Sequence, residues 1–116
     1  MSIGIVRERY TTIETTDFPG QGNAHHRYVI QTLADPSDVV GSIVFQNGPI
    51  KEVGVNGLFH EDLIAIVIHR LKAFQTSAYE CRENALAITK LEEALHWLDH
   101  RTRAREDKGI EGTHAI

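Results

Sequence analysis

The residues with the clearest chemical potential are a group of cations near the carboxyl end of the sequence: Arg101, Arg103, Arg105 and Lys108. A guanidinium group presents planar, forked donors that match phosphate oxygens, and it can also stack on a nucleobase. Arg101 and Arg105 are four residues apart, so on a helix they project to the same side. Cations also complement the dipole at a helix C-terminus, where Glu106 and Asp107 would partly neutralise them. The cluster is therefore either a phosphate clamp or an ordinary helix end.

A second group of residues could recognise a base. Phe74 and Tyr79 flank a predicted turn, and Asn84 stands at the start of the helix that follows. An aromatic ring can stack a purine, while an Asn amide can pair with an adenine edge or a ribose hydroxyl. Packing and capping are the other roles open to residues at helix ends.

The histidines do not assemble an evident catalytic or metal site. His96 and His100 have helical i, i+4 spacing, but no Glu follows His96 in the zincin manner and the spacing places no third ligand. His100 also begins an H-x-T motif of the kind that two-histidine phosphoesterases carry twice, and it occurs here once. Cys81 and Ser77 lack an evident base and orienting acid. We therefore expect no catalytic residue, no metal ligand and no cofactor.

Length and charge limit the classes of protein that fit. The 116 residues correspond to a single domain, 1–116, and the net charge of -4 argues against a general binder of DNA or RNA polymers. The longest apolar stretch, residues 63–68, is far too short to span a bilayer, and residues 1–10 contain no signal-peptide core. A single cysteine agrees with a reducing compartment. These features predict a cytosolic protein that does not act at a membrane.

The first half of the chain has the pattern of strands. β-branched residues alternate with polar ones in short runs, and Asn47-Gly48 is a strong hairpin signal. A second turn is expected at Asn56-Gly57. We predict about four antiparallel strands within the following runs: residues 1–16, 28–33, 39–46 and 50–55.

The second half has helical periodicity. Residues 59–75 are apolar on nearly all sides, which predicts a covered helix. A long helix follows over residues 80–108, with Gly109 as its stop. Ser77 and Glu80 are spaced as a capping box for its start, and Cys81 and Arg82 are equally plausible starts. The fold class is therefore α+β, with a small N-terminal sheet over residues 1–57, a helical hairpin over residues 58–108 and a tail over residues 109–116.

The predicted second helix is long for so small a protein. Some 28 residues make a rod of roughly 42 Å, which is more than a domain of this size can cover. Part of this helix should therefore contact another chain.

The run FQTSAYECRENALAITKLEEALHWLDHRTRAREDKGIEGTH, with GVNG ahead of the first helix, resembles the phage-encoded Thoeris anti-defence sponge family. The likeness covers roughly residues 53–114 and includes the words CRENALA, LEEALHWL, HRTR and the GTH tail. It implies a non-enzymatic protein that sequesters glycocyclic ADP-ribose (gcADPR), the signal made by Thoeris TIR proteins, in the cytoplasm of an infected bacterium. Some relatives also hold CBASS cyclic di- or trinucleotides at a separate site, and the resemblance implies a homodimer that assembles further into hexamers, as a trimer of dimers.

The resemblance also assigns roles to particular residues. Phe74 and Arg101 match the pair that sandwiches adenine, Asn84 and Arg105 match polar contacts to ribose and phosphate, and the family-like tail adds Thr113 to the ligand-binding set. Asn84 and Arg101 are 17 residues apart on one helix, or about 26 Å, which one small ligand cannot bridge. A shared pocket then needs an antiparallel partner helix from a second protomer.

Two other functions remain open from the sequence. A phosphoesterase would cleave the nucleotide signal rather than hold it. A purely structural phage interaction protein would bind no nucleotide. The tail is either a lid over the ligand or a frayed terminus.

Overall fold

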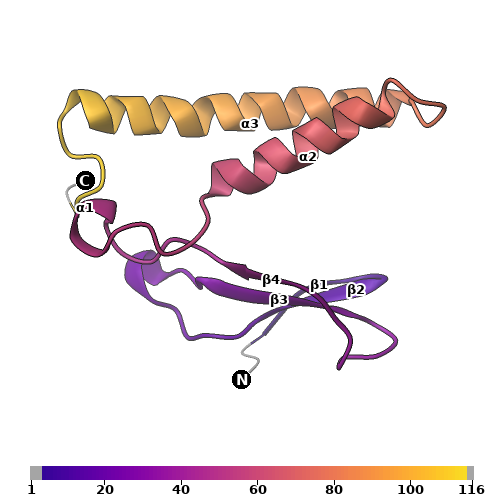
Figure 1. Cartoon of the computed structure of the whole chain (residues 1–116), viewed down its shortest axis with the longest axis horizontal. Helices are drawn as coiled ribbons and strands as arrows, with labels where there is room; N and C mark the ends of the chain where they lie inside the picture. Colours follow the sequence, from indigo (N-terminus) through magenta and orange to yellow (C-terminus); the bar gives the residue numbers. More distant parts are fainter. Residues whose placement is uncertain (1–3, 115–116) are drawn as a thin grey trace. The chain divides into compact units, whose positions relative to one another are not determined.

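The computed structural model describes residues 4–114. The chain divides into two compact units, residues 1–58 and residues 59–116. The first unit is a four-stranded antiparallel sheet and the second is built of helices, as Figure 1 shows for each unit by itself. The predicted α+β class is therefore confirmed. That residues 1–116 form a single domain stays a prediction.

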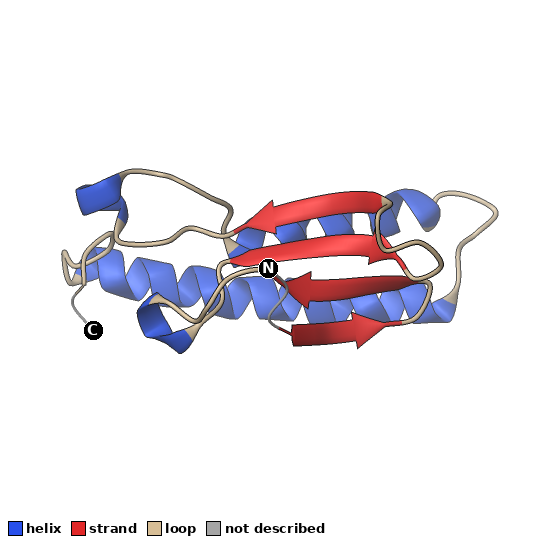
Figure 2. Ribbon diagram, turned by 90° about the horizontal axis from the view of Figure 1, so that it is seen from below, coloured by secondary structure: helices blue, strands red, loops and turns tan. Residues whose placement is uncertain are grey.

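The sheet has the simplest possible strand order, β1-β2-β3-β4, with every neighbouring pair antiparallel (Figure 2). Its elements are β1 (Gly4–Glu8), β2 (Thr11–Thr15), the short 3-10 helix η1 (Gln21–Asn23), β3 (Arg27–Thr32) and β4 (Val39–Val44). Ile13 pairs with Ile30, and Tyr28 pairs with Ile43, so one face of the central strands carries large apolar side chains. Strands β1 to β4 therefore lie, to within one residue, in the runs that the alternation of apolar and polar residues predicts.

The sequence prediction was wrong at both ends of this unit. Residues 4–15 form two strands where one was predicted over residues 1–16, because the chain reverses between β1 and β2, where the Arg9 amide donates to the Thr11 carbonyl at 2.9 Å. Asn47-Gly48 does not form a hairpin, and the expected returning strand is instead the short helix α1 (Ile50–Val53). Pro49, with a φ of -69°, precedes this helix; it has no amide to donate to a strand ladder, and its φ suits a helix entrance.

Side chains close the loop that follows β4. Gln46 donates to the Gly54 carbonyl at 2.8 Å, and Asn56 and Asn47 exchange two hydrogen bonds of 2.7 and 2.8 Å. A Cβ on Gly57 would lie 2.4 Å from the Phe45 carbonyl carbon, so only glycine fits beside this backbone. The predicted turn residues therefore shape the loop, although no hairpin results.

The helical unit has close to the boundaries that the sequence predicts, but the prediction of a covered first helix was wrong, since Ile66 and Val67 are 62% and 45% exposed. It contains α2 (His60–Phe74) and α3 (Arg82–Asp107). The Cys81 backbone is extended at the start of α3, so the Ser77–Glu80 capping box does not begin this helix. Gly109 has a φ of +71° just after the helix end, which is the left-handed conformation expected of a C-terminal stop.

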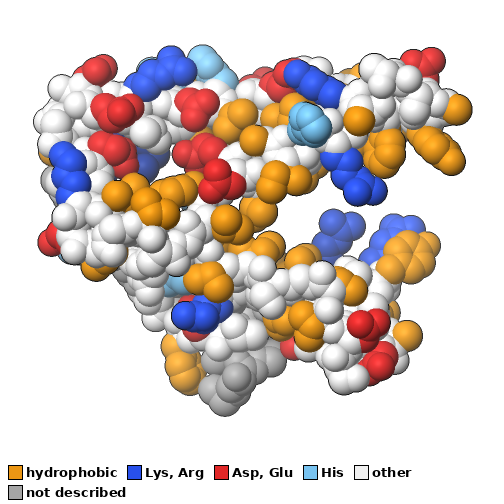
Figure 3. Space-filling view, viewed as in Figure 1, with side chains coloured by type: hydrophobic (Ala, Val, Ile, Leu, Met, Phe, Trp, Pro, Cys, Tyr) orange, Lys and Arg blue, Asp and Glu red, His pale blue; other side chains and the backbone are white. Residues whose placement is uncertain are grey.

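The hairpin has a thin core. Ile68 and Ile88 are the buried hydrophobic residues among residues 4–114, at 8% and 9% exposure. α2 has 15 residues against 26 in α3, or about 22 Å against about 39 Å, so α2 cannot cover the full length of its partner. Figure 3 shows hydrophobic side chains open to solvent along these helices. Ile66, Leu86 and Trp97 are exposed large apolar residues of the hairpin. No helix within the described part of the chain has the length and apolar character to cross a membrane.

Candidate functional site

The closed end of the hairpin brings Phe74 and Asn84 together. Phe74 is the last residue of α2, and its ring meets that of Tyr79 edge-on, with 6.2 Å between centroids. Asn84 Nδ2 donates to the Tyr79 carbonyl at 3.3 Å. Arg70 lies one turn before Phe74, with its guanidinium carbon 5.1 Å from the centre of the phenyl ring. Two predicted ligand-binding residues thus share one end of the hairpin with an aromatic and a cationic neighbour.

Side chain to backbone hydrogen bonds hold this end in shape. Gln75 spans the turn, since its Nε2 donates to the Cys81 carbonyl and its Oε1 accepts from the Cys81 amide, both at 3.0 Å. Ser77 Oγ donates to the Phe74 carbonyl at 2.7 Å, and Thr76 Oγ1 donates to the Ala73 carbonyl at 2.8 Å. The turn therefore fixes the position from which Phe74 projects.

The other end of α3 is organised around Arg105. Its Nε donates to Glu111 Oε2 at 3.2 Å, and one of its terminal nitrogens donates to the carbonyls of Ile110 and Thr113, each at 3.2 Å. Thr113 Oγ1 also donates to the Ile110 carbonyl. Residues 110–113 are thereby tied to the helix end by one guanidinium group, whose side chain is only 14% exposed.

Arg101 lies one turn earlier and differs from Arg105. It is exposed, and among residues 4–114 it forms no ion pair. The structure therefore brings Arg105 and Thr113 together and leaves Arg101 open to solvent on the same helix. An exposed, unpaired guanidinium is available to an external anion or base.

The two ends do not meet within one chain. α3 is a continuous helix from Arg82 to Asp107, and the 17 residues between Asn84 and Arg101 correspond to about 26 Å (Figure 1). One protomer thus presents an aromatic and amide cluster, Phe74 and Asn84, at one end of α3 and an arginine cluster, Arg101 and Arg105, at the other; these are the two candidate half-sites.

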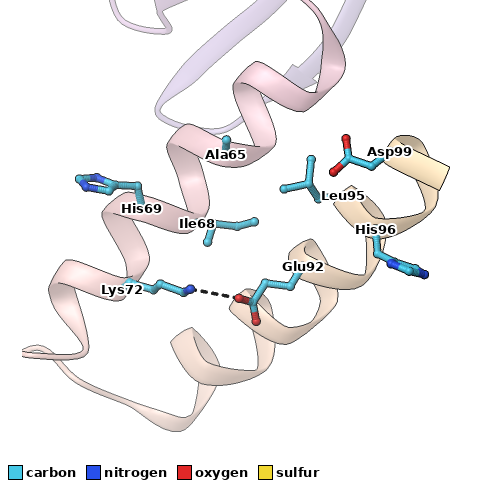
Figure 4. A pocket seen from close by; sticks show the side chains of 8 residues that line it. All are labelled: Ala65, Ile68, His69, Lys72, Glu92, Leu95, His96 and Asp99. Carbon is cyan, nitrogen blue, oxygen red and sulfur yellow. Dashed lines mark ion pairs between the residues drawn. The ribbon is translucent and has the colours of Figure 1, made fainter. Parts of the chain in front are cut away.

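A groove lies between the two helices, away from both half-sites. Its volume is about 490 Å³. Figure 4 shows its lining residues: Ala65, Ile68, His69, Lys72, Glu92, Leu95, His96 and Asp99. Lys72 and Glu92 pair across it at 3.0 Å. None of the five predicted ligand-binding residues lines this groove, and in the described part of the chain no three metal-ligating side chains gather.

Similarity to known proteins places the chain in a family. A family model described as Acb2/Tad1, hairpin domain, matches residues 37–103, which is more than half of the chain. The chain belongs to the Acb2/Tad1 hairpin-domain family. It is also 57% identical over 83 residues to the protein named Thoeris anti-defense 1 of Bacillus phage SBSphiJ7. That match spans 72% of this chain and 58% of the relative's length. The family resemblance read from the sequence is thereby confirmed.

The family match divides the candidate residues. Phe74, Asn84 and Arg101 fall inside the Acb2/Tad1 hairpin segment, whereas Arg105 and Thr113 lie beyond residue 103. Both candidate half-sites therefore include residues of the matched hairpin, and Arg105 and Thr113 follow the matched segment.

Two contacts of the site were not anticipated from the sequence. Arg70 is four residues before Phe74, a spacing that puts both on one helix face and could have identified it. Glu111 pairs with Arg105 across a turn, and no periodic pattern reports that contact, because the backbone direction after Gly109 decides it.

Proposed function

We propose that this protein is a phage anti-defence sponge that binds and sequesters gcADPR, so that a Thoeris effector is not activated in the cytoplasm of the infected bacterium. Membership of the Acb2/Tad1 hairpin family and similarity to a Thoeris anti-defense protein support the anti-defence role. The choice of ligand depends on the two half-sites, which together offer the donors and rings that an ADP-ribose nucleotide needs.

The single observation that carries this proposal is the separation of the half-sites along α3. An antiparallel second copy would bring the arginine end of one protomer to the Phe74 end of the other, forming two equivalent pockets per dimer. The thin hairpin core supports such pairing, because Leu86 and Trp97 are 46% and 60% exposed on α3.

Each residue then has a role in one composite pocket. Phe74 of one protomer and Arg101 of the other sandwich the adenine, and Asn84 donates to a ribose oxygen. Arg105 binds phosphate, with Thr113 and the tail closing over it. Charge-assisted bonds contribute about 1.5 to 3 kcal/mol each and ring stacking about 1 to 3 kcal/mol. Several such contacts are compatible with a nanomolar Kd, equivalent to about -12 kcal/mol.

Further assembly is part of the proposal on family grounds. A trimer of dimers would give a hexamer, and a separate site would take a CBASS cyclic di- or trinucleotide. Native mass spectrometry with gcADPR and with cyclic oligonucleotides tests both points. A dimer that binds gcADPR alone would remove the second site and keep the first.

The fate of the ligand tests the proposal against its main alternative. Protein is incubated with gcADPR and then denatured, and a sponge returns the ligand intact. A phosphoesterase would return a linear product, and His100→Gln would then restore intact ligand. No binding of any nucleotide by calorimetry would favour a structural phage protein. Because the five residues proposed for the pocket act through stacking and hydrogen bonds, we expect intact ligand from wild type and from His96→Gln and His100→Gln alike.

A further inference from the structure

Besides the residues already considered, we propose that Arg70 is a ligand-binding residue: its guanidinium receives a phosphate of the nucleotide whose base stacks on Phe74. The proposal depends on the proposed function, since it adds a group to the same pocket. It gives the closed end of the hairpin an anion-binding group, whereas every other cation assigned to the pocket comes from the arginine end.

The position of Arg70 is defined by its contact with the ring. Its guanidinium carbon lies 5.1 Å from the centroid of Phe74, one helical turn further on, so both side chains occupy one face of α2. Arg70 is exposed, and no carboxylate among residues 4–114 pairs with it. A cation at the rim of an aromatic platform is thus left without an anionic partner.

Some other cations of the hairpin unit have carboxylate partners, unlike Arg70 in the described part of the chain. Lys72 is also exposed, but its ammonium group pairs with Glu92 on α3 at 3.0 Å. Arg105 is likewise engaged, with Glu111 and two tail carbonyls. Among residues 4–114, no such ion pair or carbonyl hydrogen bond engages Arg70, so an anion that binds there breaks no ion pair.

The chemistry of a guanidinium suits both contacts at once. Its face can lie against an aromatic ring, while its N–H donors point outward in the plane of the group. Adenine and its 5′ phosphate are joined through a single ribose, so a base on Phe74 carries its phosphate close to that ring. The cation–π contact therefore pre-positions Arg70 donors beside the expected anion.

The test compares two ligands and three variants. Binding of gcADPR is measured by calorimetry for wild type, Arg70→Gln, Arg70→Lys and the matched control Lys72→Gln. Binding of adenosine, which has no phosphate, is followed by saturation-transfer NMR. We expect Arg70→Gln to weaken gcADPR binding about tenfold or more, since a charge-assisted bond is lost, and to leave adenosine binding unchanged. Arg70→Lys should fall between, and Lys72→Gln should match wild type within about twofold.

The possible failures are distinct. Equal weakening of gcADPR and adenosine by Arg70→Gln would mean that Arg70 only supports the Phe74 ring, and this would overturn the proposal. Unchanged gcADPR binding would overturn it as well, while leaving the proposed function in place. Wild-type protein that binds no gcADPR would overturn the proposed function, and the role of Arg70 with it. Circular dichroism of each variant checks that an exposed substitution has left α2 folded.

Discussion

The sheet unit and the hairpin unit keep their shape by different means. The sheet has antiparallel ladders between its four strands, with a register shift in the β1–β2 pair and another in the β3–β4 pair. The side chains of Asp17, Gln46 and Asn56 hydrogen-bond to the backbone of its loops. The hairpin has two buried apolar residues, Ile68 and Ile88, and leaves much of its longer helix open. The sheet unit is fastened mainly by hydrogen bonds, and its buried side chains include the polar residues Thr12 and Thr15. The hairpin packs on apolar residues instead, and the exposed flank of α3 is suited to receiving another chain.

Under the proposed function, ligand binding belongs to the hairpin unit and the sheet unit serves as a scaffold. All five proposed ligand-binding residues, and Arg70, belong to the hairpin unit. Substitutions at these six hairpin residues should therefore change ligand binding at little cost to the fold, and substitutions that loosen a sheet loop should lower stability and leave ligand binding unchanged.

The largest effect is expected when each candidate half-site is removed by mutation in a separate variant and the two variants are then mixed. Arg101→Ala and Asn84→Ala should each weaken gcADPR binding by about ten- to a hundredfold, because each removes a polar contact from every pocket. Mixed in equal amounts with free subunit exchange, they should recover about a quarter of wild-type sites: half of the dimers are mixed, and each has one intact pocket of two. Calorimetric titration counts the sites.

The control for that experiment is a direct measurement of subunit exchange between the two variants, by native mass spectrometry of mass-tagged subunits. No recovered sites despite complete exchange would mean that Asn84 and Arg101 act in separate places, and the composite pocket would have to be abandoned.

Removing the tail should have the next largest effect. Deletion of residues 110–116 takes away the segment that Arg105 holds at the end of α3. If this segment closes over bound ligand, dissociation should accelerate about tenfold, equivalent to losing one or two hydrogen bonds, with the association rate nearly unchanged. Stopped-flow displacement measures both rates. Unaltered dissociation would leave the tail as a passive end of the hairpin.

A smaller, opposite effect is expected at Glu111. Its carboxylate pairs with Arg105 at 3.2 Å and competes with phosphate for the guanidinium. Glu111→Gln should preserve the tail bonds to Ile110 and Thr113 and tighten gcADPR binding about two- to fivefold, because a partly exposed ion pair is worth about 0.2 to 1 kcal/mol. Glu106→Gln, on the same helix end, is the matched control. Weaker binding by Glu111→Gln would show that the carboxylate orients Arg105 for the ligand.

The smallest effect on binding is expected in the sheet unit. The backbone amide of His26, and then that of Arg27, donate to the Asp17 carboxylate and outweigh its desolvation, which lowers the pKa of Asp17 below its model-compound value. A lowered folded pKa adds stability above the unfolded pKa of about 3.9, and this is lost as the pH falls through the folded pKa. Asp17→Asn should therefore lower Tm at pH 7, with the difference from wild type shrinking below about pH 3.

Ligand binding by Asp17→Asn should equal that of wild type at pH 7. Asp38→Asn provides the comparison, because no hydrogen bond or ion pair of the Asp38 side chain is seen among residues 4–114. A Tm deficit that persists unchanged in acid would assign the loss to packing rather than to the charge of Asp17.

The two units also differ in how far the sequence predicts them. Both long helices were placed within two residues of their ends, since a 3.6-residue period and Gly109 are local signals. Residues 50–55 were misassigned because their β-branched content favours a strand, while Pro49 and the side-chain bonds of Gln46 and Asn56 impose a compact loop.

In the candidate site too, the sequence predicts contacts along one helix but not contacts across a turn. The pairing of Arg70 with Phe74 follows from spacing along one helix. The engagement of Arg105 by Glu111 does not, because it depends on how the chain turns at Gly109 and Gly112, both of which have positive φ. Spacing predicts neighbours on an element, and turn geometry decides contacts between elements.

The uninterrupted helix α3 determines the relative direction of Asn84 and Arg101 as well as the distance between them. Each residue advances a helix by about 1.5 Å and turns it by about 100°. One residue inserted between Ile88 and Trp97 would hardly change the separation of the half-sites, yet it would turn Arg101 by more than a quarter of a revolution relative to Asn84. A change of seven residues would restore the direction to within about 20° while altering the separation by about 10 Å. If the proposed composite pocket holds, the central part of α3 sets both the distance and the relative direction of Asn84 and Arg101, so the number of its residues matters even where their identities do not.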